Sequence, residues 1–176
     1  MHEIAREAEF GTGTIYKYFP AKEDLYFTLI DEKMVEINRL AKAVLSERSP
    51  IQQRIEKMLR VQLEYIEKNT DFFRIYLSER NRFEWTIEDA FRKKCHKKMI
   101  SYIQLLTKVM KQGVKEGALK PLNPMDLAYA LVGIINSFVF EWIMSPKPFP
   151  IISKAETILE IFLGGVQQIE RRKIDR

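Results

Sequence analysis

Prolines and glycines are scarce in this chain and separate long runs of helix-forming residues, a pattern that constrains the fold more than any other feature. Of 176 residues, only seven are proline and seven are glycine. The runs between them are rich in Leu, Ile, Glu, Lys, Arg and Met, which have high helix propensities. No alternating Val, Ile and Thr segment of the kind that forms a strand interrupts these runs. We therefore predict an all-α fold.

Apolar spacing and capping residues together predict eight helices. Ser49-Pro50 and Asn123-Pro124 each combine an N-cap side chain with a proline at the first helical position. Ser153 and Glu156 have the spacing of a capping box, and Gly117 suits a left-handed helix end. The predicted helices cover about residues 2–8, 12–19, 22–46, 50–68, 72–80, 86–115, 124–144 and 153–172.

The composition excludes several classes of protein. A single cysteine, Cys95, excludes a disulfide scaffold and a multi-cysteine metal centre. The N-terminus is charged and lacks the apolar segment of a signal peptide. The longest run without a charged residue, 127–140, has 14 residues, whereas a membrane span needs about 20. We expect a cytoplasmic protein with no membrane partner.

The sequence contains no recognisable catalytic or metal-binding pattern. The two histidines, His2 and His96, have no second ligand at a spacing that suits a metal. There is no Ser/His/Asp arrangement, no glycine-rich phosphate loop and no pair of carboxylates placed for acid–base chemistry. We expect neither a metal nor a cofactor, and we expect that the protein is not an enzyme.

The most informative segment is residues 3–25, where a tight turn separates two short helices and a third helix then begins. This is the arrangement of a helix-turn-helix DNA-binding motif. The segment resembles the TetR family of bacterial transcriptional regulators, whose pattern is Ile-Ala, then Ala-Gly-Val-Ser-x-Gly-Thr-x-Tyr-x-Tyr/His-Phe, then Lys-x-x-Leu. Ten positions fit that pattern: Ile4, Ala5, Ala8, Gly13, Thr14, Tyr16, Tyr18, Phe19, Lys22 and Leu25.

The second short helix carries side chains that suit contact with DNA. Threonine and tyrosine hydroxyls donate to phosphates, and a threonine methyl can pack on thymine. Gly13 permits close approach of the backbone, and Lys22 combines its charge with the free amides of a helix start. His2 lies near the DNA side under the family alignment. The predicted DNA contacts are His2, Thr12, Gly13, Thr14, Tyr16, Lys17, Tyr18 and Lys22.

Several features of this segment depart from the family pattern. Glu9 stands where the turn usually has glycine, and Gly11 replaces the Ser or Thr that caps the recognition helix. Residues 1–26 carry three cations and five carboxylates, whereas phosphate affinity requires cations. The first helix of the family's DNA-binding domain also has no counterpart, because the chain begins at the second. The alternative to a DNA-binding regulator is therefore a ligand-sensing dimerisation module that does not bind DNA.

The last two predicted helices suggest a dimer. The helix over 124–144 has two apolar stripes and must be covered on two sides. Each glycine of Gly164-Gly165 costs about 1 kcal/mol relative to alanine, so a close approach of another helix is expected there. A four-helix interface in a homodimer would satisfy both features; a larger monomeric core is the alternative. The predicted interface residues are Ala128, Val132, Ile135, Val139, Ile158, Phe162, Gly165 and Val166.

The middle helices are rich in aromatic residues and methionines, most of which are expected in the core. The TetR resemblance implies that a small hydrophobic effector binds between these helices and is oriented by a few polar groups. The predicted pocket residues are Met58, Tyr65, Phe72, Tyr76, Trp85, Tyr102 and Asn136.

We therefore expect a chain of two parts. Residues 1–26 form a helix-turn-helix head, incomplete because its upstream helix is missing, and residues 27–176 form a helical ligand-binding and dimerisation domain. The resemblance implies a repressor whose homodimer binds a pseudo-palindromic, double-stranded operator in successive major grooves. The effector would favour a different spacing of the heads and thereby release the DNA.

Overall fold

All regular secondary structure in the described part of the chain is helical, which confirms the predicted fold class. The computed structural model describes residues 1–83, 89–147 and 149–166, with side chains placed except over 77–96. In chain order the elements are α1 (His2–Glu7), α2 (Thr12–Tyr18), α3 (Lys22–Leu45), α4 (Ile51–Lys68), α5 (Thr70–Phe83), α6 (Asp89–Lys115), α7 (Pro124–Met144), a short 3₁₀ turn η1 (Ile151–Lys154) and α8 (Ala155–Val166).

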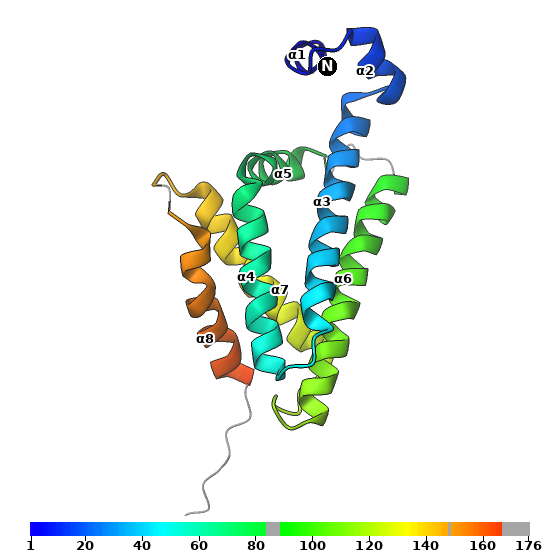
Figure 1. The fold of residues 1–176 in the computed structure, drawn as a ribbon. Helices are drawn as coiled ribbons and strands as arrows, with labels where there is room; N and C mark the ends of the chain where they lie inside the picture. Colours follow the sequence, from blue (N-terminus) through cyan, green and yellow to red (C-terminus); the bar gives the residue numbers. More distant parts are fainter. Residues whose placement is uncertain (84–88, 148, 167–176) are drawn as a thin grey trace, which may run out of the picture.

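A small head stands on one end of a larger helical domain (Figure 1). Helices α1 and α2 form the head, and α3 runs from it into the domain as one continuous helix. Helix α3 packs against α4 and α6, and α6 in turn packs against α7. Helix α5 lies across the end of the domain that is nearer to the head (Figure 1). The predicted boundary between residues 26 and 27 falls inside α3, so the two parts are joined without a loop.

Helix α4 supplies the centre of the hydrophobic core. Ile55, Leu59 and Leu63 follow one of its faces and are fully buried. Leu106 of α6 and Leu131 of α7 belong to the same buried cluster. Burying a side chain of this size contributes about 1.5–3 kcal/mol, so the domain owes its stability chiefly to this apolar packing.

One buried charged side chain, Arg54, joins three helices of the described structure at the end opposite the head. Its guanidinium donates to the carbonyl of Leu45 at the end of α3 and to Oε1 of Gln112 on α6, each over 2.9 Å. A cation is favourable at a helix C-terminus because the last carbonyls carry partial negative charge. Arg54 therefore fixes the lower end of α3 against the domain.

The structure confirms two of the predicted helix ends and corrects two others. The side chain of Asn123 accepts a hydrogen bond from the amide of Met125 over 2.9 Å, as predicted for an N-cap. Gly117 follows the end of α6 in the left-handed conformation, at φ 73°. Ser49 is not the N-cap of its helix: Pro50 takes that place without a side-chain hydrogen bond, and α4 begins at Ile51. The predicted capping box at Ser153 is wrong. Pro150 starts the 3₁₀ turn η1 before it, and the Ser153 hydroxyl donates to the Pro150 carbonyl, so α8 begins only at Ala155. The predicted extension of this helix beyond residue 166 lies outside the described residues.

Candidate DNA-binding head and effector site

The head is held together by a small contact between its two helices. Ala5 of α1 is 1% exposed, and its carbonyl accepts from the amide of Phe10 in the turn over 2.9 Å. Gly11 then takes an extended conformation and stands at the N-cap of α2 without a capping side chain. Despite this missing cap, α2 forms over Thr12–Tyr18. The geometry is that of a helix-turn-helix, with α2 in the place of the recognition helix.

Most of the predicted DNA contacts lie on the surface of α2 and at the start of α3. Thr14, Tyr16 and Tyr18 are exposed, as are Lys17 and Lys22, and a side chain at Gly13 would meet nothing within 4 Å. These residues are therefore free to approach a duplex.

The other two predicted contacts lie against each other within the head. Thr12 is half-buried, and its hydroxyl lies 3.4 Å from Nδ1 of His2. The ring of His2 also lies edge-on to that of Tyr16, with the centroids 6.5 Å apart. The side chain of His2 thus joins α1 to the recognition helix.

Two of the five carboxylates of the head belong to the start of α3. Glu23 and Asp24 lie in its first turn, where negative charge is favourable for the helix dipole. The Asp24 carboxylate accepts from the amide of Ala21 over 2.9 Å. This amide is therefore already satisfied, and Lys22 beside it supplies the positive charge available to a phosphate at this helix start.

The predicted effector residues do not gather around one cavity. Met58 and Tyr102 are buried in the core, and the hydroxyl of Tyr102 donates to Oε1 of Gln62 over 2.7 Å. Burial raises the pKa of Tyr102, and the hydrogen bond to Gln62 opposes this shift only in part.

The remaining predicted pocket residues lie elsewhere. Tyr65, Phe72 and Tyr76 are half-buried where α4 meets α5, and the rings of Phe72 and Tyr76 are stacked with centroids 6.2 Å apart. Asn136 is exposed on α7. Trp85 lies outside the described residues.

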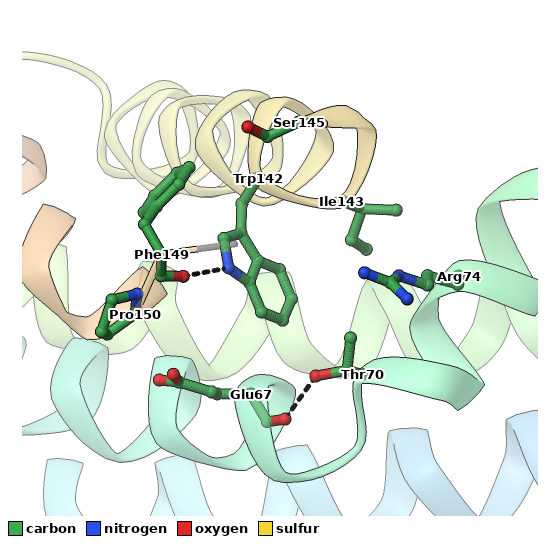
Figure 2. A pocket seen from close by; sticks show the side chains of 8 residues that line it. All are labelled: Glu67, Thr70, Arg74, Trp142, Ile143, Ser145, Phe149 and Pro150. Carbon is green, nitrogen blue, oxygen red and sulfur yellow. Dashed lines mark hydrogen bonds between the residues drawn. The ribbon is translucent and has the colours of Figure 1, made fainter. Parts of the chain in front are cut away.

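The described structure instead has a hollow above the junction of α4 and α5, which we call the corner hollow (Figure 2). Its volume is about 360 Å³. The indole of Trp142 forms one wall and donates to the carbonyl of Phe149 over 2.7 Å. This hydrogen bond holds the segment before η1 against the end of α7. The lining residues are Glu67, Thr70, Arg74, Trp142, Ile143, Ser145, Phe149 and Pro150.

None of these lining residues was predicted from the sequence. Arg74 and Trp142 are distant in the sequence, and only the fold brings them to one hollow. The available signal was a tryptophan at the end of an apolar helix, followed at once by the proline-rich segment 146–150.

Helices α7 and α8 share an exposed apolar surface, which we call the α7–α8 face. On α7 it contains Tyr129, Phe140 and Met144, which are 53%, 55% and 64% exposed, and on α8 it contains Ile161, which is 52% exposed. Side chains added at Gly133, Gly164 or Gly165 would meet nothing within 4 Å, so these glycines are not in close contact with another helix of the chain.

The predicted interface residues mostly lie on the opposite side of these two helices. The structure buries six of them in the core of the chain itself, where a partner would not reach them: Ala128, Ile135, Val139, Ile158, Phe162 and Val166. Val132 is half-buried and Gly165 is exposed. By length and composition alone α7 could cross a membrane, but in this fold it packs against α5, α6, η1 and α8.

A helix-turn-helix head carried by a continuous helix on an all-helical domain defines a class of two-part transcriptional regulators. Comparison with family models agrees. Residues 48–166 match the tetracyclin repressor-like C-terminal domain, and residues 1–29 match the bacterial regulatory proteins of the tetR family. The chain therefore belongs to the TetR family of transcriptional regulators, and it is not an enzyme.

Known proteins of similar sequence and structure include regulators of fatty acid metabolism. The chain is 21% identical over 167 residues to the fatty acid metabolism regulator protein of Bacillus subtilis (strain 168), covering 94% of this chain and 84% of that protein. The crystal structure of the transcriptional regulator FadR from Bacillus subtilis in complex with stearoyl-CoA has a TM-score of 0.77 at 21% identity, covering 93% of this chain and 87% of that one.

A second solved structure is that of AibR in complex with isovaleryl coenzyme A and operator DNA. Its TM-score is 0.71 at 16% identity, with 90% of this chain and 84% of that chain covered. At these identities the two structural likenesses establish a shared fold.

Proposed function

We propose that this protein is a homodimeric repressor that binds a pseudo-palindromic operator and is released by an effector of the acyl-coenzyme A class, which joins a hydrophobic acyl chain to a charged headgroup. The observation that carries the proposal is the exposed surface of α2 on a helix-turn-helix head, with Thr14, Tyr16 and Tyr18 available to DNA. Hydroxyl side chains there can read base edges and bind phosphates, while Lys22 binds the backbone.

The dimer is proposed on the α7–α8 face rather than on the interface residues predicted from the sequence, most of which are buried within the chain. Four large apolar side chains about half exposed lie on these two adjacent helices, and an exposed apolar patch commonly marks a protein–protein interface. The three open glycines on the same face would let helices of a second copy approach closely. Two copies joined in this way would present two heads for two half-sites of an operator.

The effector class is inferred from the named relatives. FadR of Bacillus subtilis was solved with stearoyl-CoA, and AibR with isovaleryl coenzyme A and operator DNA. Such an effector releases DNA only when it binds more tightly to the conformation in which the spacing of the two heads does not match the operator than to the conformation that binds DNA. We place this activity in the cytoplasm, where both DNA and acyl-coenzyme A are found, and assign it no membrane partner.

Fluorescence anisotropy with the DNA upstream of the protein's own gene tests the proposal. We expect binding that exceeds that of scrambled DNA and weakens steeply with salt, because released counterions drive it. Lys22→Ala is expected to lower the salt slope by about 1, because this side chain then no longer neutralises a phosphate. Lys42→Ala, which removes an exposed lysine from the far end of α3, is the matched control and should leave binding unchanged.

Two other results would decide against the proposal. Tyr16→Ala with unchanged operator affinity would show that α2 does not read DNA. Acyl-coenzyme A binding without any sequence-specific DNA binding would favour the alternative, a ligand-sensing module, for which the acidic head is the supporting observation.

A further inference from the structure

One short segment, residues 67–70, takes part in two features of the domain. On one side it forms the floor of the corner hollow, through Glu67 and Thr70. The Thr70 hydroxyl donates to the carbonyl of Glu67 over 2.5 Å and so closes the corner between α4 and α5. On the other side Asn69 binds a lysine of α3, the helix that carries the head. The segment is thus placed between the hollow and α3, the helix that carries the DNA-binding head.

The corner hollow combines apolar walls with two charged side chains. Trp142 and Phe149 supply aromatic surface, while the guanidinium of Arg74 has no carboxylate partner among the side chains that the structure places. In Figure 2 the side chains of Arg74 and Glu67 lie on opposite sides of Trp142. A guanidinium in a fixed planar fork binds carboxylates and phosphates, and aromatic walls accept apolar groups. This chemistry suits an amphipathic anion.

The volume of the hollow suits part of such a ligand. Sites for small molecules commonly measure about 300–1,000 Å³, and the corner hollow, at about 360 Å³, is near the lower limit. It can therefore hold a charged headgroup together with a few neighbouring carbons, and not the whole of a long-chain acyl-coenzyme A.

Lys33 makes the contact between α3 and the corner. Its Nζ donates to Oδ1 of Asn69 over 2.6 Å and lies 5.9 Å and 6.0 Å from the ring centroids of Tyr65 and Phe72. The amide nitrogen of Asn69 in turn donates to the carbonyl of Tyr65 over 2.8 Å. The lysine is half-buried, so these contacts are less screened by water than those of a surface pair. A shift of residues 67–70 must change them.

We propose that the corner hollow binds the anionic headgroup of the effector on Arg74, and that the hydrogen bond between Lys33 and Asn69 transmits its presence to α3. The proposal rests on the proposed function, since it takes the effector-controlled DNA binding as given. Arg74 is a binding residue, and Lys33 is a coupling residue that does not touch the ligand.

Tryptophan fluorescence and calorimetry test the site. The chain has two tryptophans, so Trp85→Phe leaves Trp142 as the only one. We expect stearoyl-CoA to change the emission of Trp142. Arg74→Gln should weaken stearoyl-CoA binding about tenfold, as for loss of a charged hydrogen bond, whereas Glu67→Gln should tighten it. Lys68→Gln, which removes a charge one residue outside the hollow, is the matched control. Unchanged emission, or equal effects of Arg74→Gln and Lys68→Gln, would overturn the proposed site.

The source of the anion is resolved by two further probes. Coenzyme A alone competing with stearoyl-CoA in an Arg74-dependent manner would show that Arg74 binds a phosphate. Arg74-dependent competition by sodium stearate would show that Arg74 binds a fatty carboxylate. Competition by neither probe would contradict headgroup binding at Arg74.

Operator release tests the coupling. We expect stearoyl-CoA to weaken the operator binding of the unsubstituted protein at least tenfold. It should weaken the operator binding of the Lys33→Met variant less than twofold. The stearoyl-CoA affinity and the thermal unfolding midpoint of this variant should stay close to those of the unsubstituted protein. Lys33→Arg, which can still donate to Asn69, should restore release, and Lys42→Met on the same helix should behave like the unsubstituted protein. Full release in Lys33→Met would overturn the coupling. A protein that binds neither operator nor acyl-coenzyme A before any substitution would instead overturn the proposed function.

Discussion

The backbone amide of Glu9 donates to the carbonyl of Arg6 over 3.1 Å and closes the turn of the head with Glu9 at φ 57°. Among the non-glycine residues described, Glu9 alone has a positive φ. This left-handed conformation brings Cβ close to the next carbonyl and costs about 1 kcal/mol for a residue other than glycine. The departure from the family's glycine therefore strains the turn and also adds a carboxylate to an acidic head.

Glu9→Gly should relieve both effects. We expect it to stabilise the turn by about 1 kcal/mol, since glycine adopts positive φ without a steric penalty, and to tighten operator binding by removing a negative charge. Glu9→Gln removes the charge and keeps the strain, so it should tighten DNA binding without stabilising the head. Thermal melts measure the effect of the strain on stability, and fluorescence anisotropy measures the effect of the charge on DNA binding. Identical melting behaviour of the two variants would contradict the strain argument.

Gly113 is the glycine at which an added Cβ would come closest to other side chains. A Cβ there would lie 2.7 Å from Cδ1 of Leu119 and 3.2 Å from Cγ2 of Ile51, both of which are fully buried. Gly113→Ala should therefore destabilise the domain by about 1–3 kcal/mol, although alanine is the better helix former. Chemical denaturation measures the change.

A second substitution checks the cause of this destabilisation. Leu119→Ala alone should cost about 2–5 kcal/mol, and because it vacates the space that the new Cβ needs, the double variant should be clearly more stable than the sum of the single changes. Simple additivity would show that Gly113→Ala acts in some other way.

The sequence predicted those features that depend on neighbours in the chain. The helix-turn-helix, the Asn123 cap and the end at Gly117 are encoded by residues a few positions apart. The capping box at Ser153 failed because Pro150, only three residues earlier, starts a competing turn. The corner hollow depends on Arg74 and Trp142, which no local pattern connects.

The face of α7 that stays exposed in the chain could not be predicted from periodicity. Tyr129 follows Ala128 directly, and consecutive residues on an α-helix differ by a rotation of about 100°. Only the packing of α6 and α8 on one side reveals that Ala128 is covered within the chain and Tyr129 is not. An apolar helix surface predicts burial, but it does not predict whether the same chain or a second copy covers that surface.

Charge placed on the α7–α8 face should separate the dimer. Phe140→Glu and Ile161→Glu are expected to give monomers in sedimentation equilibrium, because each would bury an unpaired carboxylate at the proposed interface. Both side chains are exposed within one chain, so the helical content of the monomers should be preserved. Leu122→Glu, at a comparably exposed apolar residue outside the face, is the control. Dimers that persist in both variants would exclude this face.

The stability of the domain should fall in alkaline solution because of Tyr102. Burial raises the pKa of this phenol above its ordinary value near 10, so the folded state favours the protonated form. The resulting stabilisation is complete below pH 10 and is lost as the pH rises further, with a slope of up to about 1.4 kcal/mol per pH unit. Urea unfolding between pH 8 and about pH 11 measures this slope.

Substitution of the phenol should remove most of that pH dependence. Tyr102→Phe is expected to unfold about 1 kcal/mol more easily at pH 7, because Gln62 loses its partner, but to lose less stability on going to pH 11. A smaller slope should remain, since burial also raises the pKa of Tyr65. Tyr18→Phe, at an exposed residue of the head, is the matched control. An unaltered slope in Tyr102→Phe would assign the alkaline transition to other groups.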